Sequence, residues 1–365
     1  MLSGRGKRCV HSGKKVRAVS GREADVVVVG AGGTGSAAAW QLAARGVDVL
    51  VLEARPADEP CRAAEVFRVA GAELSHNHLA LQALPLWREL EQETSTRVLT
   101  LTGGVAHGHT EDLDLLAWAA DAVGKPGRWL PPEEAVERWP GLRYAGRVFF
   151  HPLAGRIDAG VGVPALRAAA VRQGAVVRRG EPVTGIEPRG DDLVEVRTTE
   201  RGYRARRVVV AAGASSANLA GGFAPRANAE RTVDFAAVRA DLDWPVFFHH
   251  LDRPELAAGG YPGAVCGMAE PGAGLSVGFL APGAGDPAAR QRALRRYAHE
   301  WLPGADPDTA ATGECRYAAS EFVVARRGPV VVGSGFAGQG FQFLPAVGRA
   351  LAELATTGDV ARYTG

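Results

Sequence analysis

The sequence predicts an α/β protein of two intertwined domains, the second of which is α+β and contains an antiparallel sheet. Three observations support this prediction. A compact strand–turn–helix–strand unit lies near the N-terminus, strand-like runs fill residues 231–280, and a buried strand followed by a helix returns near the C-terminus. A fold that is interrupted and then resumed brings its first and last segments together. We therefore expect both segments to contact one ligand.

The composition is that of a globular protein with a basic N-terminal tail. Hydrophobic residues make up 46% of the 365 residues and charged residues 22%. No apolar run approaches the roughly 20 residues that span a bilayer, and the four scattered cysteines form no metal or disulfide pattern. Residues 1–24 carry seven Lys or Arg against one Glu. We expect residues 1–23 to be a disordered tail without a secretory signal, in a cytoplasmic protein without nucleic-acid or membrane partners. The oligomeric state stays open.

The N-terminal unit begins with a strand at residues 25–30 (DVVVVG), whose β-branched run is typical of a buried parallel strand. Good helix formers over residues 36–45, followed by a stop at Gly46, predict a helix. A second strand follows at residues 47–53 (VDVLVLE). Together these elements form a compact βαβ unit.

The turn between the first strand and the helix is a dinucleotide fingerprint. Gly30, Gly32 and Gly35 occupy the glycine positions of G-x-G-x-x-G, and Glu53 closes the second strand. The first glycine allows a tight exit from the strand, the second lets the backbone approach a pyrophosphate, and the third lets the helix lie close to the sheet. The helix N-terminus then binds phosphates, and Glu53 binds the ribose hydroxyls. We predict a Rossmann-like dinucleotide site. The acid argues against NADP, but the fingerprint does not separate FAD from NAD.

Further elements follow along the chain. Apolar positions at helical spacing predict a helix over residues 79–93, and proline residues frame a short helix over 131–139. Strand-like runs separated by Gly/Pro clusters predict the antiparallel sheet within 231–280. The remaining expected elements are a helix at 163–173, strands at 175–178, 193–198, 203–212 and 329–333, and a final helix at 344–356.

Several segments resemble the D-amino-acid-oxidase-type FAD-dependent oxidoreductases, particularly the sarcosine oxidase and N-methyl amino acid oxidase branch. They occur in the order of that family over residues 24–360. They are Phe67-Arg68, LPLWRELEQET, Thr102-Gly103-Gly104-Val105, RWPGL, VVVAAGAS, Glu314-Cys315-Arg316-Tyr317 and the loop GFAGQGFQF before the last helix. The resemblance implies FAD as the cofactor, with a non-flavin NAD enzyme as the alternative.

The resemblance also implies the domain organisation. It predicts a Rossmann-like FAD-binding domain intertwined with a second α+β substrate domain. We expect a discontinuous FAD-binding domain made of residues 24–95, 150–220 and 315–360. The substrate domain then takes residues 96–149 and 221–314.

Cofactor-binding residues follow from the same resemblance. In the family, the stretch around Val183 lies near the adenine, and the C-terminal glycine loop brings backbone N–H groups to the flavin carbonyls. Cys315, in a C-x-Y segment, matches a cysteine that forms a thioether to the flavin 8α-methyl; a free cysteine beside non-covalent FAD is the alternative. With the fingerprint, the expected set is Gly30, Gly32, Gly33, Thr34, Gly35, Glu53, Ala54, Arg55, Val183, Ala212, Gly213, Cys315, Phe336, Gly338, Gln339, Gly340 and Gln342.

The substrate pocket departs from the family. Arg68 matches the arginine that binds the substrate carboxylate, but Gln342 replaces a second basic residue and carries no charge. Glu65 takes the place of another arginine in a gapless alignment, unless it is a displaced surface residue. In the family a lysine over the flavin promotes reaction with oxygen, and its position is Ser276 here. A substrate-contacting tyrosine of the family falls near Cys266, and a histidine falls near Leu280.

Two adjacent histidines are the remaining candidates for proton transfer. His249 and His250 lie in the strand FFHHLD, and alternate side chains of a strand face opposite ways. At most one of them therefore points into the pocket. We take Arg68, Gln342, His250 and Glu65 as the candidate catalytic residues.

The expected function is FAD-dependent oxidation of the C–N bond of a small amine or amino-acid-like substrate, such as a biosynthetic intermediate. Hydride transfer to flavin N5 gives an imine, and oxygen or another acceptor receives the electrons. Two alternatives stay open. One is an FAD-dependent dehydrogenase that oxidises a C–OH bond with an acceptor other than oxygen. The other is a flavin-binding protein without turnover.

Overall fold

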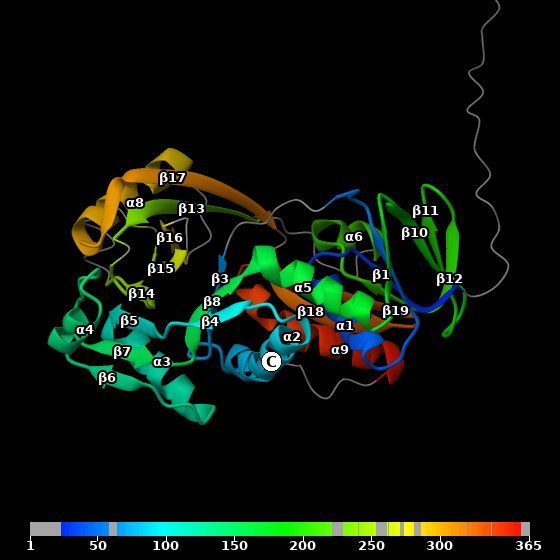
Figure 1. Ribbon diagram of the computed structural model, residues 1–365, viewed down its shortest axis with the longest axis horizontal. Helices are drawn as coiled ribbons and strands as arrows, with labels where there is room; N and C mark the ends of the chain where they lie inside the picture. The colour runs from blue at the N-terminus through cyan, green and yellow to red at the C-terminus, as the bar shows by residue number, and fades with distance from the viewer. Residues whose placement is uncertain are drawn as a thin grey trace, which may run out of the picture.

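A computed structural model describes residues 23–57, 64–220, 229–239, 241–252, 261, 263–270, 274–280, 286–317, 319–336 and 338–358. Apart from Glu23, the tail expected at 1–23 lies outside these residues. Figure 1 shows two lobes, with the three-stranded β3–β8–β4 sheet between them and the long strands β13 and β17 reaching from the second lobe toward the first. Within the described ranges, no helix is both long and apolar enough to cross a membrane.

The first lobe is built on a largely parallel sheet. Five strands run parallel in the order β9-β2-β1-β12-β19, β18 pairs antiparallel with β19, and the β10–β11 hairpin extends the first half of β12. Both faces of β1 and β2 are buried, which explains their continuous apolar runs. The strands are β1 Ala24–Val29, β2 Val49–Glu53, β9 Val176–Arg179, β10 Val183–Pro188, β11 Val194–Thr198, β12 Gly202–Val210, β18 Ala319–Arg327 and β19 Val330–Phe336.

Helices cover one face of this sheet, apart from the short α6, whose Ala217 belongs to the core on the opposite face. α1 packs between α5 and α9, and α2 packs on both α5 and α9. A Cβ at Gly348 of α9 would lie 2.5 Å from the Ala37 backbone of α1, so a glycine is required for this close packing. The elements are α1 Gly33–Ala43, α2 Leu74–Thr94, α5 Ala159–Arg172, α6 Ser216–Leu219, α9 Leu344–Thr356 and the 3-10 turns η1 Gly213–Ser215 and η2 Gly338–Phe343. The expected βαβ unit is present, and α2 begins five residues before the expected helix.

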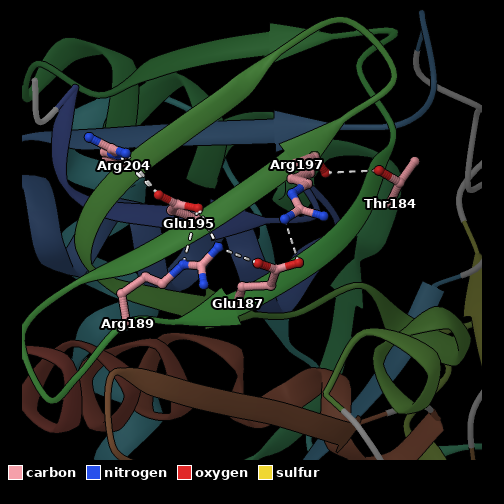
Figure 2. A network of polar contacts seen from close by, with 6 residues as sticks. All are labelled: Thr184, Glu187, Arg189, Glu195, Arg197 and Arg204. Atoms are coloured by element: carbon pink, nitrogen blue, oxygen red, sulfur yellow. Dashed lines mark hydrogen bonds and ion pairs between the residues drawn. The ribbon is translucent and has the colours of Figure 1, made fainter. Parts of the chain in front are cut away.

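A ladder of charged side chains joins the strands β10, β11 and β12 on the exposed face of the hairpin (Figure 2). Arg189 lies 2.6 Å from Glu187 and 2.9 Å from Glu195, measured from Nη2 to the carboxylate oxygens. Glu187 also pairs with Arg197 at 2.6 Å, and Glu195 pairs with Arg204 at 2.9 Å. Hydrogen bonds from two arginines lower the pKa of Glu195. Exposed pairs of this kind add little stability individually because solvent screens them, but they connect all three strands of the hairpin region that begins at Val183.

The second lobe is an eight-stranded sheet in the order β17-β13-β16-β15-β14-β5-β7-β6. It is antiparallel except where β14 runs parallel to β5, because β14 enters after the chain has passed through the first lobe. The helices α3 and α8 in this lobe were not expected. The elements are β5 Gly104–Gly108, β6 Arg128–Leu130, β7 Val148–His151, β13 Ala229–Val238, β14 Val246–His250, β15 Val265–Glu270, β16 Gly274–Phe279, β17 Ala305–Tyr317, α3 Thr110–Ala122, α4 Pro132–Arg138 and α8 Pro287–Trp301.

A three-stranded sheet lies between the lobes. Its strands are β3 Ala64–Arg68, β8 Ala154–Asp158 and β4 Leu99–Leu101, in the order β3-β8-β4. The side chains along β3 alternate between the two lobes: Val66 packs against the second-lobe core, whereas Phe67 is fully buried in the first-lobe core. The predicted fold class is confirmed, since an α/β lobe is interrupted by an α+β lobe and then resumed.

Candidate active site

The glycine turn after β1 is shaped for close backbone approach. Gly30 has φ +100°, and a Cβ there would lie 2.5 Å from the Ala211 carbonyl oxygen of the neighbouring chain segment. A Cβ at Gly35 would lie 1.9 Å from the Gly30 carbonyl oxygen, so the helix can approach the strand only with glycine at this position. At Gly32, by contrast, a Cβ would meet nothing within 4 Å. Gly32 is also the N-cap of α1 and brings no side-chain acceptor to the first-turn N–H groups. These N–H groups can therefore bind an anion.

Glu53 joins the end of β2 to this turn. Its side chain is buried, Oε2 accepts a hydrogen bond from the Ala31 N–H at 2.7 Å, and Oε1 accepts one from the Arg55 N–H at 3.0 Å. The Arg55 guanidinium lies 3.6 Å from Oε1. A carboxylate held in this way sits at the edge of the turn, where it can accept hydrogen bonds from a ribose.

A cavity of about 650 Å³ extends from the glycine turn to the end of β19. Ser334 was not expected at this site; its hydroxyl is buried without a hydrogen-bond partner in the part of the chain that is described. The expected residues that line the cavity are Gly30, Gly32, Gly33, Thr34, Glu53, Ala54, Arg55, Val183, Ala212, Gly213 and Phe336. N–H donors at the turn, a carboxylate beside them and an apolar wall at Val183 fit a dinucleotide such as FAD.

An adjoining cavity of about 280 Å³ shares Gly32, Gly33, Glu53 and Arg55 with the first. Arg167 of α5 lines it and donates a hydrogen bond to the Ala31 carbonyl at 2.9 Å. Sequence reasoning missed Arg167, because an arginine in an alanine-rich helix carries no motif of its own. The arginine adds a positive charge beside the expected phosphate site.

The C-terminal loop meets β3 at the other end of the site. The Gln342 side chain is buried, its Oε1 accepts a hydrogen bond from the Arg68 backbone N–H at 2.9 Å, and its backbone carbonyl accepts one from Trp87 Nε1 at 2.8 Å. The structure thus brings two predicted site residues together. Gly338, Gln339 and Gly340 lie in η2 of the same loop.

Arg68 is held at the junction of the two lobes. Its guanidinium carbon lies 4.5 Å from the centre of the Phe248 ring of β14, a distance typical of a cation–π contact. Burial lowers the pKa of the guanidinium, and the nearby Cys266 thiol opposes that effect. No carboxylate among the described residues forms an ion pair with Arg68. A largely desolvated cation is therefore available to an anionic group of a ligand.

The adjacent histidines of β14 face opposite sides of the sheet. His249 is fully buried in the second-lobe core, 4.0 Å from the His107 ring centre and with Nδ1 3.2 Å from the Tyr297 hydroxyl. His250 shares the face of Phe248, and its Nδ1 lies 3.6 Å from the Asp112 carboxylate. Only His250 is thus on the side of the sheet that meets Arg68.

Two further expected residues are Glu65 and Cys315. Glu65 is three positions before Arg68 in β3, so strand alternation places it on the opposite face, with Phe67. Cys315 lies in β17, opposite Arg231 of β13, and its side chain is outside the described part of the chain.

The family described as FAD dependent oxidoreductase (DAO) matches residues 25–354. The chain belongs to this family. It is therefore an FAD-dependent oxidoreductase, as its sequence predicted, and the cavity beside the glycine turn is the place where its residues fit FAD.

Individual relatives show which members of the family the chain is similar to. The chain is 30% identical to a monomeric sarcosine oxidase of Streptomyces avermitilis, over 93% of this chain and 96% of that protein. It is 28% identical to a monomeric sarcosine oxidase of Bacillus sp. (strain NS-129), over 92% of this chain and 93% of that protein. Among solved structures it is similar to NikD, an unusual amino acid oxidase essential for nikkomycin biosynthesis, with 27% identity and a TM-score of 0.76 over 94% of this chain and 96% of that chain. The predicted sarcosine oxidase branch is confirmed.

The second-lobe sheet also contains a buried glutamate, Glu270, that was not predicted from the sequence. Glu270 ends β15 on the face of Cys266 and Met268, and it is only 7% exposed. Burial raises its pKa, while hydrogen bonds from the Ala64 N–H and the Ser276 hydroxyl oppose that effect. The period-two alternation in VCGMAE was the signal that could have revealed it. Ser276 itself is buried.

Proposed function

We propose that this oxidoreductase oxidises the C–N bond of a small amine or amino-acid-like substrate to an imine. The observation that carries the proposal is the half-buried Arg68 guanidinium, which forms no ion pair with a carboxylate in the described residues. The backbone of Arg68 is joined to the C-terminal loop by the hydrogen bond to Gln342. Bound FAD supplies the acceptor for a hydride from the carbon next to nitrogen. The similarity to sarcosine oxidases and to an amino acid oxidase supports nitrogen compounds as substrates.

The protein's own residues orient the substrate and exclude water. Arg68 binds an anionic or carbonyl group of the substrate, because a desolvated guanidinium gains most from such a partner. Phe248 packs against the guanidinium and limits its movement. Gln342 fixes the backbone of Arg68 relative to the loop. Orientation of this kind lowers the barrier without a strong base, provided that the amine reacts in its neutral form.

The finer points of the cofactor and its reoxidation are also proposals. We infer a thioether between Cys315 and the flavin, on the basis of the C-x-Y segment alone. If the protein is precipitated with acid, a covalent flavin stays in the pellet, and the Cys315→Ala variant releases it to the supernatant. We also propose slow reaction with oxygen, because Ser276 carries no charge that would stabilise superoxide. A biosynthetic role and a cytoplasmic location rest on the sequence alone.

A second candidate function is oxidation of a C–OH bond with an acceptor other than oxygen. The observation that favours it is the His250–Asp112 contact, because a histidine beside a carboxylate can take a hydroxyl proton.

The two candidates are separated by anaerobic mixing of the FAD-loaded protein with matched compounds. N-methylglycine and L-proline represent the amines, and glycolate and L-lactate represent the alcohols. We expect the amines to bleach the visible absorption of the flavin, with formation of an aldehyde or a cyclic imine. Bleaching by the hydroxy acids alone would replace the first function by the second.

A further inference from the structure

His250, Asp112 and His109 meet where the end of β14 lies against the first turn of α3. The Asp112 Oδ2 atom lies 3.6 Å from His250 Nδ1 and 3.3 Å from His109 Nδ1. The backbone N–H of His109 donates a hydrogen bond of 2.6 Å to the His250 carbonyl. The carboxylate is therefore placed between two imidazoles, and the backbone of His250 is fixed by the same helix end.

The second nitrogen of His250 is directed away from α3. Nε2 is buried and has no hydrogen-bond partner among the residues that the structure describes. The two nitrogens of an imidazole point to opposite sides of the ring, so a ring whose Nδ1 faces α3 turns Nε2 toward the interior. On that side His250 shares a strand face with Phe248, against which Arg68 is packed. Arg68 is close enough to lower the pKa of the imidazole.

The pair also spans the boundary between the interior and solvent. The His250 side chain is 15% exposed, whereas the Asp112 side chain is 51% exposed. A proton that reaches the buried imidazole therefore has a short route to water through the carboxylate. His151 also lines the small cavity at Arg68, but its ring nitrogens contact the Lys125 carbonyl and the Leu153 N–H, and His249 faces the opposite core.

We propose that His250 and Asp112 form the proton outlet of the substrate site. His250 Nε2 takes the proton of a substrate ammonium group, and Asp112 is a positioning residue that holds the Nδ1 proton and hands it to solvent. The proposal rests on the proposed amine oxidation, because an amine that binds as a cation must lose a proton before its carbon can give up a hydride. It also narrows the substrate class to amines that arrive protonated.

The proton transfer is balanced without an oxidant. The N–H bond of the ammonium breaks, its electron pair stays on the substrate nitrogen, and an Nε2–H bond forms on His250. The resulting imidazolium then releases its Nδ1 proton at Asp112, where water accepts it. After the product leaves, Nε2 gives its proton to water and Nδ1 regains one by way of Asp112, which restores the starting tautomer. No electrons leave the substrate until this neutral amine has formed.

The charges around His250 set the expected pH dependence. Burial is the largest effect and lowers the pKa of His250, Asp112 raises it, and Arg68 and His109 lower it. Without the Asp112 charge the imidazole becomes a weaker base and loses the partner that fixes its tautomer. Its ability to accept the ammonium proton should fall accordingly.

The test compares Asp112→Asn, His250→Gln and a control, Asp114→Asn, in the FAD-loaded protein with N-methylglycine as the probe. Asp114 lies on the same helix but pairs with Arg147. We expect flavin reduction near neutral pH to slow roughly tenfold in Asp112→Asn and roughly a hundredfold or more in His250→Gln. The His250→Gln rate should recover as the pH approaches the pKa of the free amine, because a neutral amine needs no base. The control should behave as the wild type does.

An NMR measurement on histidine-labelled protein tests the proposal independently of turnover. We expect neutral His250 to carry its proton on Nδ1, and Asp112→Asn to lower its pKa and shift the tautomer toward Nε2. If N-methylglycine and other amines do not reduce the flavin, the proposed function fails, whereas the tautomer result still tests the pair. An Nε2–H tautomer in the wild type would contradict the proposal that His250 accepts the substrate proton. Unchanged rates of flavin reduction in His250→Gln would contradict it as well.

Discussion

The buried histidine pair of the second lobe makes the protein sensitive to acid. His107 and His249 are directly opposite each other on the parallel strands β5 and β14, with ring centres 4.0 Å apart. Both side chains are almost fully buried. Burial lowers the pKa of His249 to about 3 and lowers the pKa of His107 well below its usual value. We therefore expect both rings to be neutral in the folded protein between about pH 5.5 and about pH 7.5.

The size of the effect follows from proton linkage. Below a pH of about 6.5 the unfolded chain binds a proton at each of these histidines, and the folded chain does not. The stability that depends on a neutral His249 is therefore present above about pH 6.5 and is lost as the pH falls toward the folded pKa. Between about pH 7.5 and about pH 5.5 the free energy of unfolding should decrease by about 1.4 kcal/mol for His249 alone. His107 acts in the same direction.

Urea unfolding of the wild type and of His249→Gln at both pH values measures this loss. The variant should be less stable at the higher pH, because a packed ring is removed, but its stability should fall by about 1.4 kcal/mol less on acidification. His299→Gln is the control, since that side chain is 61% exposed. Equal pH dependence in the wild type and in His249→Gln would refute the reasoning.

Three further predictions concern the site. Gly32→Ala should leave the melting temperature nearly unchanged but weaken FAD binding in a fluorescence titration. Gly35→Ala should lower both the melting temperature and the affinity for FAD, because its Cβ meets the Gly30 carbonyl. Glu270→Gln should raise the free energy of unfolding at neutral pH. The raised pKa makes the folded protein hold a proton that the unfolded chain releases, so wild-type stability falls as the pH rises, and urea unfolding should show no such fall in the variant. Arg68→Ala should lower kcat/KM for carboxylate-bearing amines by roughly ten- to a hundredfold in steady-state assays, with little effect on amines that lack a carboxylate.

The cofactor side of the site was predictable because its signal is local. Gly30, Gly32, Gly35 and Glu53 lie within one βαβ unit, so their spacing in the sequence fixes their positions in space. The family resemblance then extended the prediction to the C-terminal loop. Arg167 was missed because its contact with Ala31 spans 136 residues and depends on how α5 packs beside α1.

The substrate side was less predictable because it depends on pairing between distant strands. His250 comes to lie beside Asp112 only because β14 pairs in parallel with β5, the strand that precedes α3. The sequence alone left undecided whether Glu65 enters the same pocket as Arg68. In the structure β3 lies between the two cores, and the two side chains point to opposite faces of the strand. No helix was predicted for the segment that forms α8, although its apolar residues recur at helical spacing.

The visible absorption spectrum of the purified protein, recorded before and after anaerobic addition of N-methyl amino acids and cyclic amino acids, tests the central claim most directly. We expect flavin bands at the start, supplied if necessary by added FAD, and bleaching of these bands by at least one of these amines. A protein that shows no flavin and does not bind added FAD would contradict the assignment of the cavity beside the glycine turn. Bound FAD that no amine reduces would contradict the proposed reaction.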